Sequence, residues 1–203
     1  MRICGDEFHS GRPVHEDMKQ IAKYYGDTGM LDFIGVVGSG CDTHNTPANV
    51  IPNMTFPPEP FLHLAAGIKE VVDVPVLHAQ NIKDPNQATR ILEGAYVDMV
   101  GMTRAHIADP HLIAKIKMGQ VDQIKQCVGA NYCIDRQYQG LDVLCIQNAA
   151  TSRECIRRAA HHRGSPPDRS ARWWWSAAKA GMEAARVAAE RGHDVTLFEK
   201  KEA

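Results

Sequence analysis

Three cysteines in the second half of the chain are the residues whose type and spacing point most directly to chemistry. Cys127, Cys133 and Cys145 follow the spacing C-x5-C-x11-C. Six cysteines in 203 residues are too few for a disulfide scaffold, so a group of them indicates a metal or redox site. From the residues alone, two alternatives stay open: buried, inert thiols, or a zinc ion completed by a nearby histidine.

The elements that must position these cysteines alternate between strand and helix patterns. Continuous apolar runs typical of buried strands cover residues 2–4, 31–37, 74–79 and 97–101. Apolar residues at helical spacing follow them, starting near Val14, Phe61, Pro85 and Asp109. Four such β/α units predict a parallel sheet covered by helices, either doubly wound or part of a (β/α)8 barrel.

The overall charge and hydropathy exclude several classes of protein. The formal net charge is −1 and no block of lysine and arginine occurs, so the sequence does not predict a nucleic-acid partner. No apolar run approaches the length of a membrane span. We expect a globular protein of the cytoplasm that acts on a small molecule, with neither nucleic acid nor membrane as partner.

The composition and periodicity of the sequence change beyond residue 119. A cysteine-bearing segment gives way to a stretch rich in proline, arginine and histidine without periodicity, and then to a short helix pattern and the strand pattern DVTLFEK. The predicted organisation is residues 1–119 as one domain, 120–154 as a stretch that contains the three cysteines, 155–179 as a linker, and 180–203 as the start of another domain.

Residues 2–154 resemble the long members of the old yellow enzyme class, such as dimethylamine and trimethylamine dehydrogenases, dienoyl-CoA reductase and N-methyl amino acid demethylases. The resemblance rests on VDMVGMTRAHIADPHL (97–112), VPVLHAQNI (74–82) and QCVGANYCIDRQYQGLDVLCIQNAATSRE (126–154). It implies the C-terminal half of an FMN-binding TIM barrel, a (β/α)8 fold. An iron–sulfur segment and the truncated start of a Rossmann-like dinucleotide-binding domain would follow.

In this class the FMN phosphate lies at the loops after the last two barrel strands. The resemblance assigns that role to Gly101, Met102, Thr103 and Arg104, and to the pair Gln80 and Asn81, where relatives commonly carry an arginine. Arg2 matches an arginine that faces the flavin ring, where a cation stabilises negative charge on the reduced cofactor.

The same resemblance implies a [4Fe-4S] cluster at the three cysteines. Relatives place four cysteine ligands here, and Cys127, Cys133 and Cys145 match the first, third and fourth of them. The second position is Ala130. We therefore predict a cluster with three cysteine ligands, while Cys4, Cys41 and Cys155 match no ligand position.

The C-terminal stretch resembles the opening of an FAD- or NAD(P)H-binding domain. Gly181 matches the third glycine of the Gly-x-Gly-x-x-Gly loop, and Glu199 matches the acidic residue that holds a ribose hydroxyl. The valine-rich strand and first glycines expected before them are replaced by RWWWSAA (172–178). An aromatic platform for bases or membrane would need basic or amphipathic flanks, which are missing.

A shift of reading frame explains the three tryptophans. Tryptophan has the single codon TGG. A run of TGG codons reads as a run of GTG, which is one of the valine codons, when the reading frame moves by one nucleotide. We hypothesise that residues 155–179 are translated out of frame. A serine codon of the AGC or AGT kind at Ser176, or an Arg172 codon that does not end in G, would contradict this hypothesis.

We expect a fragment of an FMN-dependent NAD(P)H:flavin oxidoreductase, with an N-methylated amine as the favoured substrate. The alternative is an inactive, frame-damaged translation product. No catalytic residue is assigned, because the groups for substrate binding and proton transfer in relatives precede this region, and His44, His63 and His78 have no spaced partner. An open half-barrel would pair with a complementing half or form a homo-oligomer.

Overall fold

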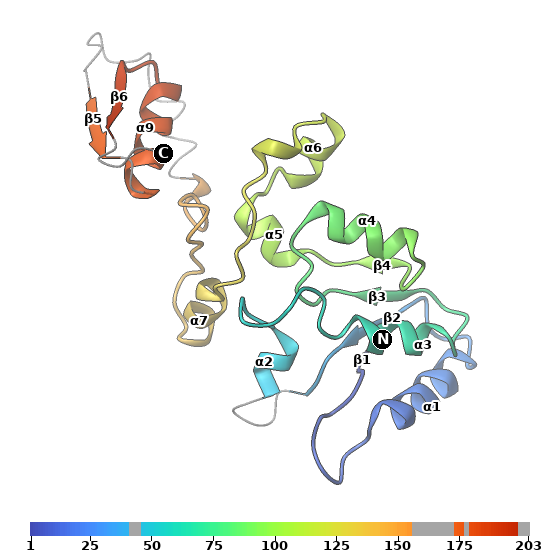
Figure 1. Ribbon diagram of the computed structural model, residues 1–203. Coiled ribbons are helices and arrows are strands. Elements are labelled where there is room, and N and C mark those ends of the chain that lie inside the picture. Colours follow the sequence, from blue (N-terminus) through green and yellow to red (C-terminus); the bar gives the residue numbers. More distant parts are fainter. Residues whose placement is uncertain (41–45, 156–172, 177–178, 199–203) are drawn as a thin grey trace. The chain divides into compact units, whose positions relative to one another are not determined.

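The computed structural model describes residues 1–40, 46–155, 173–176 and 179–198. It divides the chain into two compact units, Met1–Ser152 and Arg153–Ala203. Figure 1 shows the helices and strands of each unit.

The first unit is built on a four-stranded parallel sheet, whose strands lie in the order β1-β2-β3-β4. The strands are β1 (Arg2–Cys4), β2 (Ile34–Val37), β3 (Val76–His78) and β4 (Met99–Val100). Every neighbouring pair is parallel. This confirms the predicted mixed α/β fold with a parallel sheet, and it places the loops after β3 and β4 at the same end of the sheet.

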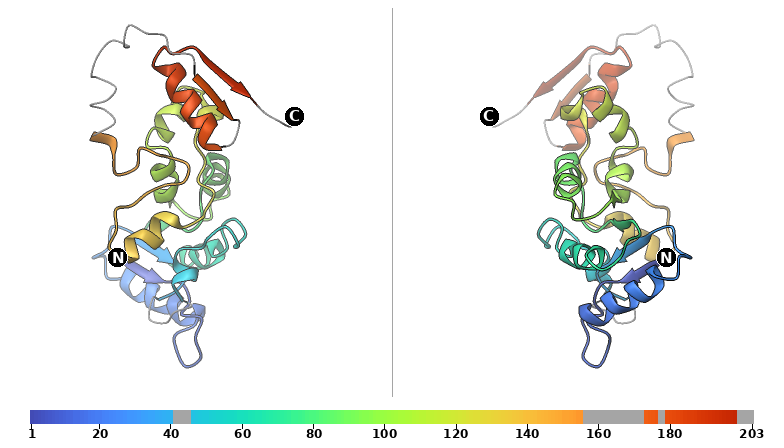
Figure 2. Two further views of the ribbon diagram at one scale, coloured as in Figure 1. Left: turned by 90° about the vertical axis from the view of Figure 1, so that its left-hand side faces the viewer. Right: turned by 90° about the vertical axis from the view of Figure 1, so that its right-hand side faces the viewer.

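Helices connect the strands, and α1, α3 and α4 pack on them (Figures 1 and 2). The helices of the first unit are α1 (His15–Gly26), α2 (Thr46–Val50), α3 (Leu62–Lys69), α4 (Pro85–Glu93), α5 (Thr103–Ala108), α6 (Leu112–Lys117), the 3-10 helix η1 (Val121–Gln123) and α7 (Tyr132–Tyr138). The start of α4 is fixed by sequence, because Asp84 accepts the N–H of Asn86 at 2.9 Å and Pro85 occupies the first turn.

The two faces of the sheet have different surroundings. Ile3, Ile34, Val36 and Val76 point to one face and are buried against apolar residues of the helices. Arg2, Gly35, Leu77 and Met99 form one row across the four strands and point to the opposite face. Arg2 and Met99 of that row are exposed and Leu77 is half-buried, whereas Gly35 is buried, so this face is the less covered one.

The helix predicted from about Asp109 begins elsewhere. α5 already starts at Thr103, Asp109 ends it in an extended conformation (φ −139°, ψ 95°), and α6 starts at Leu112. The cause is Pro110, because a residue that precedes proline is pushed out of the helical region. The expected start at Asp109 was therefore wrong, and the break places a buried carboxylate between two helices.

The second unit contains a strand–helix–strand motif. β5 (Trp173–Ser176) pairs in parallel with β6 (Val195–Phe198), and α9 (Lys179–Glu190) connects them. The tryptophans thus form a strand at the place where the valine-rich strand was expected, in keeping with the high strand preference of tryptophan. This backbone does not test the reading-frame hypothesis, because tryptophan and valine both favour strands.

Within the part of the chain that the structure describes, no helix is long and apolar enough to cross a membrane.

Candidate functional site

The loops after β3 and β4 approach each other closely at the end of the sheet. The N–H of Gly101 donates to the carbonyl of His78 at 2.8 Å. A Cβ atom at position 101 would lie 2.7 Å from the Cβ of Ala79. Glycine is therefore required at the start of the β4 loop, because any side chain would push the two loops apart.

The side-chain NH2 groups of two amide residues in the β3 loop donate to backbone carbonyls of the protein. Gln80 is buried and donates to the carbonyls of Asn49 at 2.5 Å and Val50 at 2.9 Å. Asn81 is buried, has a left-handed backbone (φ +56°) and donates to the carbonyl of Pro57 at 2.9 Å. These amides hold the loop in place, so its backbone N–H groups are the better candidates for a ligand.

Arg104 lies in the first turn of α5 and reaches two other loops. Its guanidinium donates to the side-chain oxygen of Asn131, and to that of Asn81 at 3.4 Å. Asn131 in turn donates to the carbonyl of Ile51 at 2.8 Å. A guanidinium carries five N–H donors, so these two contacts leave others for a ligand. Of its neighbours in the β4 loop, Met102 is buried in the core and Thr103 is exposed.

Arg2 lies apart from this network. It is the first residue of β1, at the opposite edge of the sheet from β4. Its side chain is exposed on the less covered face. The structure thus brings Asn81 and Arg104 together directly, with Gly101 in the same pair of loops, whereas Arg2 shares only the sheet with them.

The three predicted cysteines line one shared pocket. Its lining contains Cys127, Cys133 and Cys145, together with Arg104 and Ala130. Burial raises the pKa of Cys133, and the neighbouring Cys127 and Cys145 thiols add to that rise, whereas Arg104 opposes it. Cys145 accepts the N–H of Gln147 at 3.4 Å. The predicted grouping of the cysteines is therefore present in the fold.

The pocket does not have the geometry of a site for a single ion. Among the described residues, no three histidine, cysteine, aspartate or glutamate side chains converge closely enough to bind one metal. Four-coordinate zinc needs such convergence. A [4Fe-4S] cluster distributes its thiolates over different irons, so its ligands stand further apart around a shared pocket.

Arg104 faces this pocket as well as the loops of the sheet. Burial lowers the pKa of Arg104, while the Cys127 and Cys133 thiols favour its charged form. The residue keeps its positive charge, since guanidinium groups do not lose it in proteins. Such a charge stabilises thiolates and other anions that enter the pocket.

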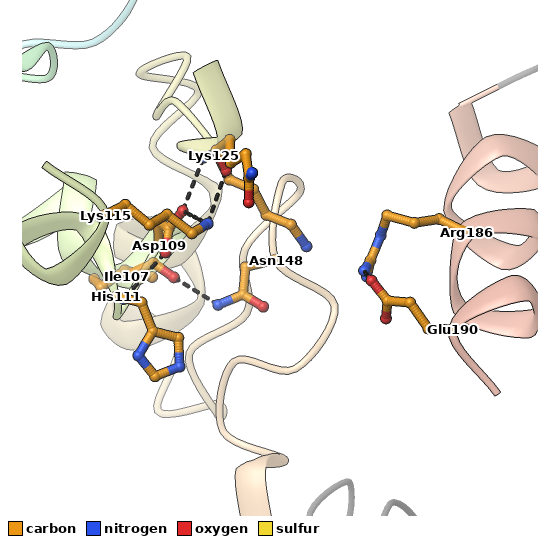
Figure 3. A network of polar contacts seen from close by, with 9 residues as sticks. Ile107, Asp109, His111, Lys115, Lys125, Asn148, Arg186 and Glu190 are labelled. Atoms are coloured by element: carbon orange, nitrogen blue, oxygen red, sulfur yellow. Dashed lines mark hydrogen bonds and ion pairs between the residues drawn. The ribbon is translucent and has the colours of Figure 1, made fainter. Parts of the chain in front are cut away.

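The segment that carries the three cysteines, residues 125–148, is held at both ends by α5 and the turn after it (Figure 3). Asp109, which is 3% exposed, accepts the backbone N–H of Lys125 at 2.9 Å. The side chain of Asn148 donates to the carbonyl of Ile107 at 3.0 Å. We call this segment, residues 125–148, the cysteine segment. The helix that begins with the β4 loop therefore also fixes the cysteines.

Further contacts stabilise Asp109 as a carboxylate. Lys115 approaches it at 2.5 Å and the N–H of His111 at 3.0 Å. Burial alone raises the pKa of Asp109, but hydrogen bonds from Lys115, Lys125 and His111 outweigh burial and bring that pKa below its ordinary value. Asp109 is therefore ionised at neutral pH.

Sequence reasoning missed Asn131, Asp109 and Asn148 as residues of the site. Their contacts join positions 16 to 80 residues apart, and a local pattern cannot reveal such pairs. The one available signal is residue type, because asparagine tolerates the left-handed backbone that Asn131 adopts at φ +56°.

His78, at the end of β3, is fully buried. Among the described residues neither ring nitrogen has a hydrogen-bond partner of good geometry. Burial lowers its pKa to about 4, so the ring is neutral at physiological pH. Of the other two histidines considered in the sequence, His63 is exposed and His44 lies outside the described residues.

Of the two residues predicted for the second nucleotide site, one can be placed. Gly181 lies in the first turn of α9 and is half-buried. Glu199 lies outside the described residues.

Comparison with proteins of known sequence shows one clear group of relatives. The chain is 74% identical over 201 residues to N,N-dimethylglycine/sarcosine dehydrogenase of Chromohalobacter salexigens, an alignment that covers 98% of the chain and 29% of that protein. It is 38% identical over 199 residues to a probable N-methylproline demethylase of Rhizobium meliloti, again over 29% of that protein. The chain thus spans less than a third of the length of these relatives.

Solved structures agree with this grouping. The chain matches 2-naphthoyl-CoA reductase with a TM-score of 0.86 and 27% identity, over 100% of this chain and 30% of the other. Histamine dehydrogenase from Rhizobium sp. 4-9 matches with a TM-score of 0.82 at 23% identity, over 29% of that chain, and supports the fold alone.

A family model identifies the catalytic class. It matches residues 39–123, the stretch that contains the loops after β3 and β4. With its dehydrogenase and demethylase relatives, the chain belongs to the NADH:flavin oxidoreductase / NADH oxidase family, which is a family of oxidoreductases.

Proposed function

We propose that the chain is the FMN- and cluster-binding part of an oxidoreductase that acts on N-methylated amines. One observation carries the proposal: Arg104 contacts the loop after β3, lies in the first turn of the helix after β4 and lines the pocket of the three cysteines. A single cation thus connects the two places where the family resemblance puts the flavin and the cluster.

The residues at the end of the sheet fit the phosphate of FMN. Gly101 lets the two loops approach, the buried amides of Gln80 and Asn81 fix the β3 loop, and Arg104 supplies charge and free donors. We propose that backbone N–H groups of both loops and the Arg104 guanidinium hold the phosphate. Arg2, on the less covered face, would stabilise negative charge on the flavin ring. When bound, FMN supplies the two-electron oxidation of substrate.

The pocket fits an iron–sulfur cluster by the chemistry of its donors. Three thiols surround one space, a backbone N–H points at Cys145, and the Arg104 cation lies beside them. Thiolates are the ligands that such clusters prefer, and hydrogen bonds to their sulfurs tune the reduction potential. When bound, a [4Fe-4S] cluster carries single electrons away from the flavin.

The relatives favour the substrate class. The high identity to a protein named N,N-dimethylglycine/sarcosine dehydrogenase, over almost the whole chain, supports a small N-methylated amino acid. We also propose that the protein is located in the cytoplasm. A complementing barrel half, in the same or another copy of the protein, would cover the open face of the sheet.

The second unit has the β-α-β order with which dinucleotide-binding domains begin. We propose that it is such a beginning, for FAD or NAD(P)H. Ser176 and Ala178 occupy the positions of the first two glycines, which lets fewer backbone groups approach a pyrophosphate. Binding of the second nucleotide by this chain would therefore be weak or absent.

The alternative is a translation product without turnover, and flavin binding separates the two. The 203-residue chain should quench FMN fluorescence with a saturable dependence on concentration. Arg104→Gln should weaken that binding, and Arg191→Gln, the same change at an exposed site in the second unit, should not. Failure of the folded wild-type chain to bind FMN would favour the inactive product.

A further inference from the structure

Ala130 lines the pocket of the three cysteines and lies in sequence midway between Cys127 and Cys133. A cubane cluster presents four irons, and full protein ligation needs four donors. The pocket offers three thiols, and the alanine methyl group has no donor atom that could serve as the fourth.

The other lining residues do not replace the missing ligand. Among the described residues that line the pocket, none is a histidine, aspartate or glutamate. Asn131 has both ends of its amide engaged, one with Arg104 and the other with the carbonyl of Ile51 at 2.8 Å. The ring of Tyr132 lies 5.7 Å from the guanidinium carbon of Arg136, and amide or phenol oxygens suit iron–sulfur iron less well than thiolate does.

We propose that this pocket binds a site-differentiated cluster, in which Cys127, Cys133 and Cys145 hold three irons and the fourth iron, at Ala130, carries an exchangeable non-protein ligand. The inference rests on the proposed cluster and adds its ligation. Water, hydroxide or a small external thiol is the class of ligand that fits an open corner beside a half-buried loop. The Arg104 cation in the same pocket favours an anionic ligand such as hydroxide or thiolate.

An open corner makes one iron labile towards oxidation. Removal of one electron from [4Fe-4S]2+ by an outer-sphere one-electron oxidant such as ferricyanide gives [3Fe-4S]+ and free Fe2+. Charge and atoms balance, because the 2+ cluster loses one electron and divides into a 1+ cluster and a 2+ ion, while ferricyanide becomes ferrocyanide. Iron atoms that a protein thiolate holds do not leave so readily.

The test uses the full 203-residue chain, reconstituted anaerobically with ferrous iron and sulfide. After one equivalent of ferricyanide, a ferrous chelator should detect one iron released per cluster, and the EPR spectrum of [3Fe-4S]+ should appear. Ala130→Cys should slow the release about tenfold or more, because it supplies the fourth thiolate. Ala130→Val, which adds bulk without a ligand, should behave like the wild type.

The outcomes are separable. A wild-type cluster that keeps all four irons under oxidant overturns the inference while leaving the proposed cluster intact. Equal release from wild type and Ala130→Cys, when both carry a cluster, overturns it too. A folded wild-type chain that takes up no iron and sulfide overturns the cluster itself and the inference with it. If Ala130→Cys does not fold, iron release from the wild-type chain alone still tests the inference.

Discussion

The cysteine segment and the β5-α9-β6 motif of the second unit present opposite combinations of backbone and side chain. In the cysteine segment little regular structure is present beyond α7, yet three thiols and a cation line one pocket. In β5-α9-β6 the two strands pair in parallel, and in the nucleotide-binding start that we propose for this motif Ser176 and Ala178 would take the places of two glycines. Topology tolerates replacement of strand residues, whereas a ligand site depends on particular atoms.

The two regions also differ in how their side chains are held. Both ends of the cysteine segment are tied to α5 by buried polar groups, Asp109 and Asn148. On α9, Arg186 forms exposed ion pairs with Glu183 and with Glu190 (Figure 3). Such pairs contribute little to stability. We therefore expect substitutions in the first region to have large and specific effects, and those in the second to have small ones.

The largest effect is expected at the buried thiol. Cys133→Ser should abolish uptake of the cluster, because only Cys127 and Cys145 would remain as thiolate ligands. Iron and sulfide content after anaerobic reconstitution measures this. Cys155→Ser, at an exposed cysteine outside the pocket, is the matched control and should leave the content unchanged; a full cluster in Cys133→Ser would refute the assignment.

The second largest effect is expected at Asp109, which accepts the N–H of Lys125 at the start of the cysteine segment. Asp109→Asn should lower the free energy of unfolding of the first unit by roughly 2 kcal/mol, because it removes the charged partner of Lys115 and weakens the bond from Lys125. Denaturant titration at neutral pH measures this. Asp122→Asn, at an exposed aspartate in η1, should leave that stability almost unchanged.

The same carboxylate predicts a dependence on pH. Its pKa is lowered in the folded state, so its contribution is present above the unfolded pKa of about 4 and is lost as the pH falls through the folded pKa. The melting temperature of the first unit should fall on acidification in that range, and the fall should be smaller in Asp109→Asn. Identical pH profiles for wild type and variant would contradict this.

A smaller effect is expected at Arg104. Arg104→Gln should weaken FMN binding about tenfold, the equivalent of one charge-assisted hydrogen bond. It should also lower the midpoint potential of the cluster, because a cation beside the pocket favours the more reduced and more negative state. A change in flavin affinity without a change in potential would restrict Arg104 to the phosphate site.

The smallest effect is expected in the second unit. Titration of the chain with ADP, a fragment common to FAD and NAD(P)H, should give no saturable heat. Saturable binding at micromolar concentration would show that Ser176 and Ala178 are compatible with a nucleotide, and it would break the contrast between the two regions.

The repeating parts of the fold were predictable from sequence, but the contacts that assemble the site were not. Continuous apolar runs and helical spacing predicted four parallel β/α units, because burial on both faces imposes those patterns. The boundary between α5 and α6 was missed, because Pro110 keeps Asp109 out of the helical conformation and so ends α5 at Ala108. Arg104 was predicted as a ligand by motif, but its contact with Asn131, 27 residues away, depends on how the cysteine segment folds back.

The central claim is that the three pocket thiols hold an iron–sulfur cluster, and the metal content of the reconstituted chain tests it most directly. Iron and acid-labile sulfide, measured together after anaerobic reconstitution and removal of excess reagents, should both approach four per chain. A single tightly bound iron or zinc without sulfide, or no metal at all in the folded protein, would contradict the account.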